Sequence, residues 1–225
     1  MKRTLLRSAI AVFPILTGQA AITYVDATSS NTTGSTYITT GNVYNDNLWS
    51  IRTVGSANSD VVGNTVFEAG PLGAGEDVPV LSTLISGLTP GATYELYVFF
   101  VTFPATDANQ LWRIQSGLTA GTLTQYDRDS AGTIVLPDGS TTTLVDPSNS
   151  PVTVPTNRDY RQATLGTAVA DGSGNITIFV DAGTGTNAAN HRTWYDGVGY
   201  LAVPEPAASL LGLVGMTALL RRRRC

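Results

Sequence analysis

Cysteine, histidine and lysine are almost missing from this chain of 225 residues. The one cysteine is Cys225, the one histidine is His191 and the one lysine is Lys2. A single cysteine cannot form an internal disulfide, and one histidine cannot build a zinc site with it. A Ser-His-Asp relay would need His191, yet no Gly-x-Ser-x-Gly segment or comparable nucleophile setting occurs. We therefore predict no catalytic residue and no enzyme activity, and stability that comes from packing.

Positive charge is scarce between the two ends of the chain. Seven of the 13 basic residues lie at the termini, and Glu205 is the one acid beyond Val203 among 17. Residues 21–203 therefore hold six arginines and 16 acids, a formal charge of 6 − 16 = −10. Such a surface repels nucleic acid and anionic polymers, which excludes nucleic acid as a partner. It also favours solubility outside the cell.

Helical periodicity is missing as well. No stretch between residues 21 and 203 shows a 3.6-residue apolar stripe over three turns. Short apolar or alternating segments are separated by turn signals such as Asp171-Gly172-Ser173-Gly174. They predict an all-β fold, an antiparallel β-sandwich of jelly-roll type, in one domain over residues 21–203. The expected strands are Ala21–Asp26, Trp49–Val54, Val61–Glu68, Val80–Ile85, Thr93–Thr102, Leu111–Gln115, Thr133–Leu136, Thr141–Val145, Tyr160–Ala168, Ile176–Asp181 and Trp194–Val203.

Two local features add to this expectation. The segment Leu88-Thr89-Pro90-Gly91-Ala92-Thr93-Tyr94 resembles the tyrosine corner of sandwich domains, in which a tyrosine hydroxyl bonds back to the backbone near the preceding turn. The following strand is apolar on both faces through Phe100, which predicts a central, covered strand. The proline-rich stretch Pro147–Arg158 is either an internal linker or a long surface loop.

The C-terminal segment has three parts. Pro204-Glu205-Pro206 is held extended by its prolines, an apolar run follows from Ala207 to Leu220, and the basic block Arg221, Arg222, Arg223, Arg224 comes next. The apolar run is shorter than the roughly 20 residues that span a bilayer, so a buried terminal helix is the alternative. Adjacent arginines favour a membrane segment, because they mark the cytoplasmic side.

This arrangement resembles the PEP-CTERM sorting signal of Gram-negative bacteria, over residues 204–225 only. The resemblance implies processing by an exosortase-type enzyme and transient anchoring in the inner membrane by a hydrophobic helix at 207–220 with a stop at 221–224. It also implies sorting to the cell envelope or the extracellular surface, where extracellular polysaccharide is a candidate partner. Cys225 departs from the pattern, since such tails usually stop on the basic cluster.

The N-terminal segment agrees with export. Lys2, Arg3 and Arg7 are followed by the apolar stretch Ala9–Leu16 and by Gly18-Gln19-Ala20. This order of basic, apolar and small residues predicts a signal peptide over residues 1–20.

Acidic side chains in loops or at strand ends are candidate metal ligands, because oxygen ligands suit calcium. They are Asp26, Asp107, Asp127, Asp129, Asp181 and Asp196. Many carbohydrate-binding jelly rolls hold a structural calcium between the first and last strands, and Asp26 and Asp196 occupy comparable positions. Solvated surface acids are the alternative, and Asp127-Arg128-Asp129 is better interpreted as an ion-paired turn. No cofactor other than calcium is a candidate.

The tryptophans could bind sugar, because sugar rings stack on exposed aromatic faces. The three are Trp49, Trp112 and Trp194. We favour burial for each, since stability has to come from packing. The leading hypothesis is an exported, surface-sorted, non-catalytic structural or adhesive component of the cell envelope or exopolysaccharide matrix. The alternatives are a carbohydrate-binding module with structural calcium and, third, a polysaccharide-degrading enzyme, which would need two facing carboxylates.

Overall fold

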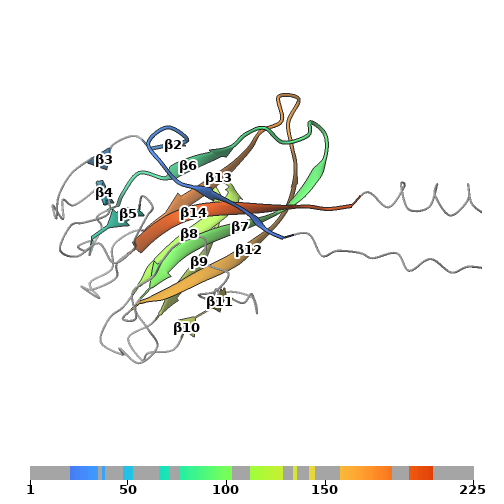
Figure 1. Ribbon diagram of the computed structural model, residues 1–225. Helices are drawn as coiled ribbons and strands as arrows, with labels where there is room; N and C mark the ends of the chain where they lie inside the picture. Colours follow the sequence, from blue (N-terminus) through green and yellow to red (C-terminus); the bar gives the residue numbers. More distant parts are fainter. Residues whose placement is uncertain are drawn as a thin grey trace, which may run out of the picture.

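The structure, a computed structural model, describes residues 21–34, 37–38, 48–52, 66–70, 77–102, 112–128, 134–135, 142–144, 158–183 and 193–204. These residues form β-strands and no α-helix, arranged as two sheets packed face to face (Figure 1). The predicted all-β antiparallel sandwich is therefore confirmed. No helix in these ranges is long and apolar enough to cross a membrane. The predicted signal peptide, the apolar run 207–220 and the arginine block lie outside the described residues.

The larger sheet contains both ends of the described chain. In spatial order it holds β11 (Thr142–Leu144), β12 (Asp159–Val169), β7 (Thr93–Thr102), β14 (Thr193–Ala202), β5 (Val66–Ala69), β4 (Trp49–Arg52) and β3 (Tyr37–Ile38). An eighth strand, β1 (Thr23–Asp26), pairs with β14 beside this path. All of these pairs are antiparallel except β3 with β4.

The smaller sheet covers one face of the larger one. Its order is β10 (Ile134–Val135), β9 (Thr122–Arg128), β8 (Arg113–Thr119), β13 (Ile176–Asp181), β6 (Leu81–Ile85) and β2 (Thr32–Thr33). Every predicted strand overlaps one of the observed strands, and β2, β3 and β9 were not predicted.

The main core lies between the two sheets. Its largest fully buried side chains are aromatic or long aliphatic, and they include Trp49, Phe67, Leu81, Phe100, Ile114, Tyr126 and Tyr195. A second cluster lies on the other face of the larger sheet, because Tyr97, Phe99 and Val101 alternate along β7 with core residues. Strand β7 is thus buried on both faces between β12 and β14, and the prediction of a central, covered strand is confirmed.

The tyrosine corner is present in the turn before β7. The Tyr94 hydroxyl accepts a hydrogen bond of 3.0 Å from the backbone N–H of Thr89. The Tyr94 ring is buried and meets the ring of Tyr200 edge-on, with 5.6 Å between centroids. The corner therefore joins the β6–β7 turn to β14.

The two ends of the described chain lie side by side. Strand β1 runs antiparallel to β14, with Thr23 opposite Tyr200, and the Val203 N–H donates to the Thr93 carbonyl at 3.0 Å. Figure 1 shows β1 beginning where β14 ends, at the right of the view. We call the opposite end, where β14 begins at Thr193 and β7 ends at Thr102, the distal end of the sandwich.

Candidate functional site

A β-bulge in β14 positions the most unusual side chain among the described residues. One edge of β14 pairs with β5 through Tyr195 and then with β1 from Gly197. On the other edge the register with β7 passes from Tyr195 opposite Phe100 to Gly197 opposite Phe99. Asp196 is the extra residue at this change of partner, and a bulge commonly redirects such a side chain.

The Asp196 side chain is closed off from solvent and held by two phenols. Its exposed fraction is 0%. Its Oδ2 accepts hydrogen bonds from the Tyr24 hydroxyl at 2.6 Å and from the Tyr160 hydroxyl at 2.5 Å. Its backbone carbonyl accepts from the N–H of Ala27 at 3.0 Å. Oδ1 has no hydrogen-bond partner within the described part of the chain.

Asp26, the other predicted calcium ligand, approaches the same place from β1. It lies opposite Gly197, and the Tyr24 hydroxyl is 3.3 Å from its Oδ1. Gly197 is needed for this approach, because a Cβ there would lie 2.8 Å from the Tyr24 hydroxyl oxygen and 2.5 Å from the Val25 carbonyl oxygen. The structure thus brings Asp26 and Asp196 together across the first and last strands.

The electrostatics of the cluster follow from burial. Burial raises the pKa of Asp196 to about 7, the hydrogen bonds from Tyr160 and Tyr24 oppose that rise, and the charge of Asp26 adds to it. Burial, followed by the charge of Asp196, raises the pKa of Tyr160 well above its usual value. Around neutral pH, Asp196 therefore exchanges between a carboxylic acid and a buried carboxylate.

Two carboxylates are only part of what calcium requires. Calcium binds six to eight oxygens, whereas the side chains of two aspartates supply four carboxylate oxygens at most. Within the described ranges, no group of three or more His, Cys, Asp or Glu residues could hold a metal ion. This pair would therefore need further oxygens from water or from other parts of the chain.

Aromatic rings surround the buried carboxyl group. Tyr24 meets Phe99 edge-on at 5.4 Å between centroids, and Phe99 stacks on Tyr160 at 5.8 Å. General acid or base catalysis requires contact between the group and its substrate. These rings separate Asp196 from solvent, so its geometry suits a structural or cation-holding role better than a catalytic one.

The predicted tryptophan ligands are buried, which confirms the preferred interpretation. Trp49 and Trp112 belong to the core between the sheets, and the Trp49 Nε1 donates to the Pro79 carbonyl at 2.7 Å. Trp194 belongs to the second cluster and is 8% exposed. None of the three offers an open ring face on which a sugar could stack.

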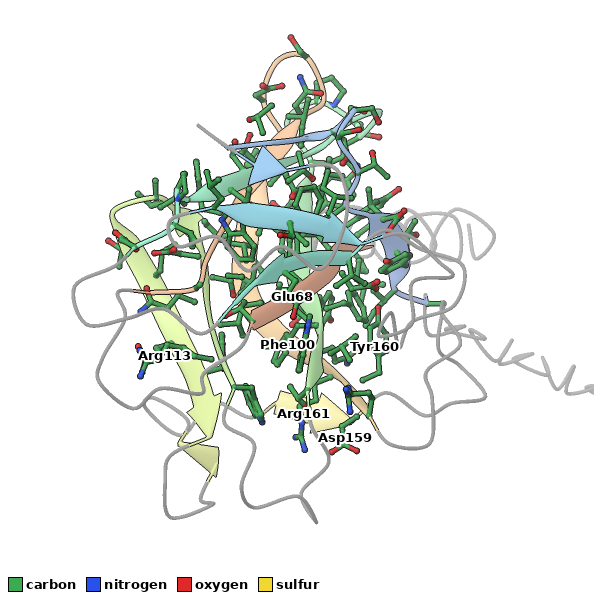
Figure 2. The ribbon with its side chains drawn as sticks, turned by 90° about the vertical axis from the view of Figure 1, so that its left-hand side faces the viewer. Glu68, Phe100, Arg113, Asp159, Tyr160 and Arg161 are labelled. Atoms are coloured by element: carbon green, nitrogen blue, oxygen red, sulfur yellow. The ribbon has the colours of Figure 1, made fainter. Side chains whose placement is uncertain are left out.

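Charged side chains at the distal end pack on two of these tryptophans. The Arg158 guanidinium lies 5.4 Å from the Trp194 ring centroid, and that of Arg161 lies 5.8 Å from the Trp112 centroid. Arg161 is also paired with Asp159 at 3.0 Å. Figure 2, which views this end, shows Asp159 and Arg161 together and Arg113 well apart from them.

The remaining predicted site residues are scattered or lie outside the described residues. Asp181 ends β13, and burial raises its pKa. The backbone of Asp127 lies opposite that of Arg113 on β8. Pro204 is the last described residue. Outside the description lie Asp107, Asp129, His191, Glu205, Pro206 and Arg221 to Arg224.

Sequence reasoning did not identify Tyr24 or Tyr160 as site residues, and it did not predict the burial of Arg161. The positions of Tyr24 and Tyr160 in the sequence carry no signal of this role, because their contact with Asp196 depends on a bulge and on the packing of strands that are far apart in the sequence. Arg161 lies third in β12, where an arginine in an alternating strand is ordinarily expected on the surface. The Asp196-Gly197 pair, a combination typical of turns, lies inside β14 and was the one local signal of an irregularity there.

No protein-family model matches this sequence, and no curated protein matches it significantly. Among solved structures, the carbohydrate-binding module TmCBM27, studied for specific mannan recognition, aligns with 81% of this chain and 99% of its own. The TM-score of that alignment is 0.31 and the sequence identity is 13%. A likeness this weak supports no conclusion about ligand or activity, and the fold assignment comes from the strand pairing described above.

Proposed function

We propose that this chain is an exported, surface-sorted, non-catalytic β-sandwich protein that serves as a structural or adhesive component of the cell envelope or exopolysaccharide matrix. The observation that supports it best is the pairing of the first and last strands. Because Thr23 lies opposite Tyr200, the segments before β1 and after β14 both join the sandwich at one end. A domain attached at that end presents its distal end and the outer face of the smaller sheet to its surroundings.

The absence of catalysis is part of this proposal. The strongest titratable cluster in the described residues, Asp196 with its two tyrosines, is buried beneath aromatic rings. A substrate cannot reach that carboxyl group without opening the second cluster.

The test of sorting separates the two parts of the tail. Replacing Pro204-Glu205-Pro206 with three alanines should leave export intact and block processing, so that the precursor stays in the inner membrane. Replacing Arg221 to Arg224 with serine should instead release the protein unsorted, since each arginine near an anionic membrane contributes about 1 kcal/mol of attraction. Cell fractionation shows where each variant is located. N-terminal sequencing shows whether the signal peptide has been removed, with Ala21 or Ile22 expected as the first residue.

The matched control replaces Thr167 on the outer face of β12 with alanine, which should sort like the wild type. If both tail variants reach the cell surface as the wild type does, the sorting proposal is wrong. A mature chain that still begins at Met1 would remove the argument for export.

A second candidate function, a carbohydrate-binding module with structural calcium, is favoured by one observation. Asp26 and Asp196 meet across β1 and β14, and Asp196 Oδ1 lacks a hydrogen-bond partner among the described residues. An ion bound only by the folded state stabilises it, by about 2.7 kcal/mol at one hundred times the dissociation constant. Calcium should raise the melting midpoint, EDTA should reverse this, and Asp26→Asn should lose the response. A midpoint unmoved by millimolar calcium rules this site out.

A further inference from the structure

The outward face of the smaller sheet differs in character from the acidic remainder of the domain. Side chains alternate along a strand, and the buried positions of β6 and β13 face the core. Ser82 and Leu84 on β6 and Thr177 and Phe179 on β13 therefore face outward. Leu84 is 41% exposed, and the other three are half-buried.

Strand register aligns part of this face in a single row. Thr33 lies opposite Ser82, Ser82 opposite Phe179, and Phe179 opposite Gly117, across β2, β6, β13 and β8. The hydroxyls of Thr33 and Ser82 share a hydrogen bond of 2.8 Å. With strands about 4.8 Å apart, the row crosses about 14 Å of the surface. Gly117 places no side chain beside Phe179 on β8, and the space that its Cβ would take is bordered by the Thr122 carbonyl oxygen and the Leu123 side chain of β9.

The rows on either side of this one also carry uncharged side chains. In one of them Leu84 lies opposite Thr177. In the other the Gln115 amide donates to the Gln125 side chain at 2.9 Å. We call the outward-facing residues Thr33, Ser82, Leu84, Gln115, Thr177 and Phe179 the polar strip. None of them is charged, although residues 21–203 carry a formal charge of −10.

We propose that the polar strip binds a chain of a neutral polysaccharide. The apolar face of a sugar ring can stack on Phe179, while the hydroxyls of Thr33, Ser82 and Thr177 can exchange hydrogen bonds with sugar hydroxyls. Arg113, two residues before Gln115 on the same face of β8, is a cation beside the strip. An acidic polymer is nevertheless repelled by the domain as a whole, because residues 21–203 carry a formal charge of −10. This inference rests on the proposed role in a polysaccharide matrix, and it adds the surface and the class of polymer.

The experiment is affinity electrophoresis of the purified full chain, kept in mild detergent. Native gels contain hydroxyethyl cellulose, dextran or soluble xylan as neutral probes, or alginate as the acidic probe. At least one neutral polymer should retard the wild type, and alginate should not. Phe179→Leu keeps an apolar side chain but removes the ring, and Ser82→Asp places a charge in the central row. Each should weaken the retardation at least tenfold.

Thr167→Asp, at an exposed position of β12 on the other sheet, is the matched control and should bind like the wild type. Circular dichroism and sedimentation establish that all variants remain folded and report their oligomeric state. Absence of retardation by all three neutral polymers overturns the proposal. So does wild-type retardation of Phe179→Leu, or a Phe179→Leu change confined to oligomeric state, which would assign the strip to contact with a second copy. These measurements use purified protein, so a failure of the sorting experiment leaves them unchanged.

Discussion

At the scale of single residues, the protonation of Asp196 makes the folding stability depend on pH. Burial raises the pKa of its carboxyl group in the folded chain from the ordinary 3.8 to about 7. The folded state therefore holds this proton through a pH range in which the unfolded state has lost it. The stability that this proton contributes is complete below about pH 4 and is lost as the pH rises through 7.

Asp196→Asn should remove this dependence, because an asparagine oxygen can still accept from Tyr24 and Tyr160 without carrying charge. One pKa unit corresponds to about 1.4 kcal/mol, so lowering the pH from 8 to 5 should stabilise the wild type by about 2–3 kcal/mol more than the variant. Urea unfolding of both proteins at the two pH values, in EDTA, measures the difference. Equal pH dependence in wild type and variant would show that Asp196 keeps its charge in the folded state.

Tyr94 offers a second test at the same scale. Tyr94→Phe preserves the ring but leaves the Thr89 N–H without its acceptor. The free energy of unfolding should fall by about 1–2 kcal/mol, the cost of one unpaired and partly buried backbone group. Tyr200→Phe, in the ring that packs against Tyr94, is the control and should leave the thermal midpoint nearly unchanged. An unaltered midpoint in Tyr94→Phe would mean that the hydrogen bond adds nothing to stability.

At the scale of secondary-structure elements, the turn between β12 and β13 depends on one glycine. Asp171 Oδ1 accepts from the N–H groups of Ser173 at 2.8 Å and Asn175 at 2.9 Å, which closes the turn. Gly174 follows with a φ of 75°, and a Cβ there would overlap the carbonyl oxygen of Leu88. The turn is thereby held against Leu88, the first residue of the tyrosine-corner segment.

Gly174→Ala should destabilise the protein by about 3 kcal/mol, because it combines a left-handed backbone with a clash against main chain. Gly172→Ala is the matched control, since a Cβ there meets nothing within 4 Å. Its effect should stay within about 0.5 kcal/mol. Thermal unfolding of the two variants makes the comparison, and similar losses in both would contradict the structural explanation.

Most strands could be predicted because their side chains alternate or are continuously apolar between strong turn signals. Strand β7 was predicted at its observed bounds for this reason. Strand β9 was missed because Thr122–Arg128 is largely polar and its hairpin turn, Ala120-Gly121, lacks a proline or asparagine. The short β2 and β3 depend on pairing with distant strands, which no local pattern reveals.

The candidate site was predictable only in part. The pairing of Asp26 with Asp196 followed from their positions near the first and last strands. The burial of Asp196 and its two phenol donors depend on a bulge and on β12, which contributes Tyr160 from far along the chain. Periodicity within a strand contains no information about such a contact.

At the scale of the whole molecule, a short chain of hydroxyls connects the two sheets through the core. Thr32 and Thr83 of the smaller sheet share a hydrogen bond of 2.9 Å, and Thr83 meets the hydroxyl of Tyr195 from the larger sheet at 2.6 Å. All three residues are fully buried. Buried polar groups that are fully paired favour one relative position of the sheets, since any slip would leave them unpaired.

A double-mutant cycle with Thr83→Val and Tyr195→Phe should reveal this connection. Thr83→Val removes the partner of the buried Tyr195 hydroxyl, and Tyr195→Phe leaves Thr83 with only its hydrogen bond to Thr32. Each single change should cost about 1–3 kcal/mol. The double variant should cost less than the sum of the single changes by about 1 kcal/mol, because both partners are then gone. Chemical denaturation of the four proteins gives the coupling energy, and strict additivity would show that the two hydroxyls do not act on each other.

The pairing of β14 with β1 and β7 also determines how the molecule would carry mechanical load. The chain leaves the sandwich along the axis of β14, an interior strand that is flanked on both edges. A pull on the C-terminal segment is directed along that strand, so its ladder bonds to both neighbours are sheared together instead of opening one after another. Resistance to force then depends on the rate of unfolding rather than on equilibrium stability. If the proposed anchoring and polymer binding hold, this connection would let the domain transmit tension between polymer and anchor while it stays folded.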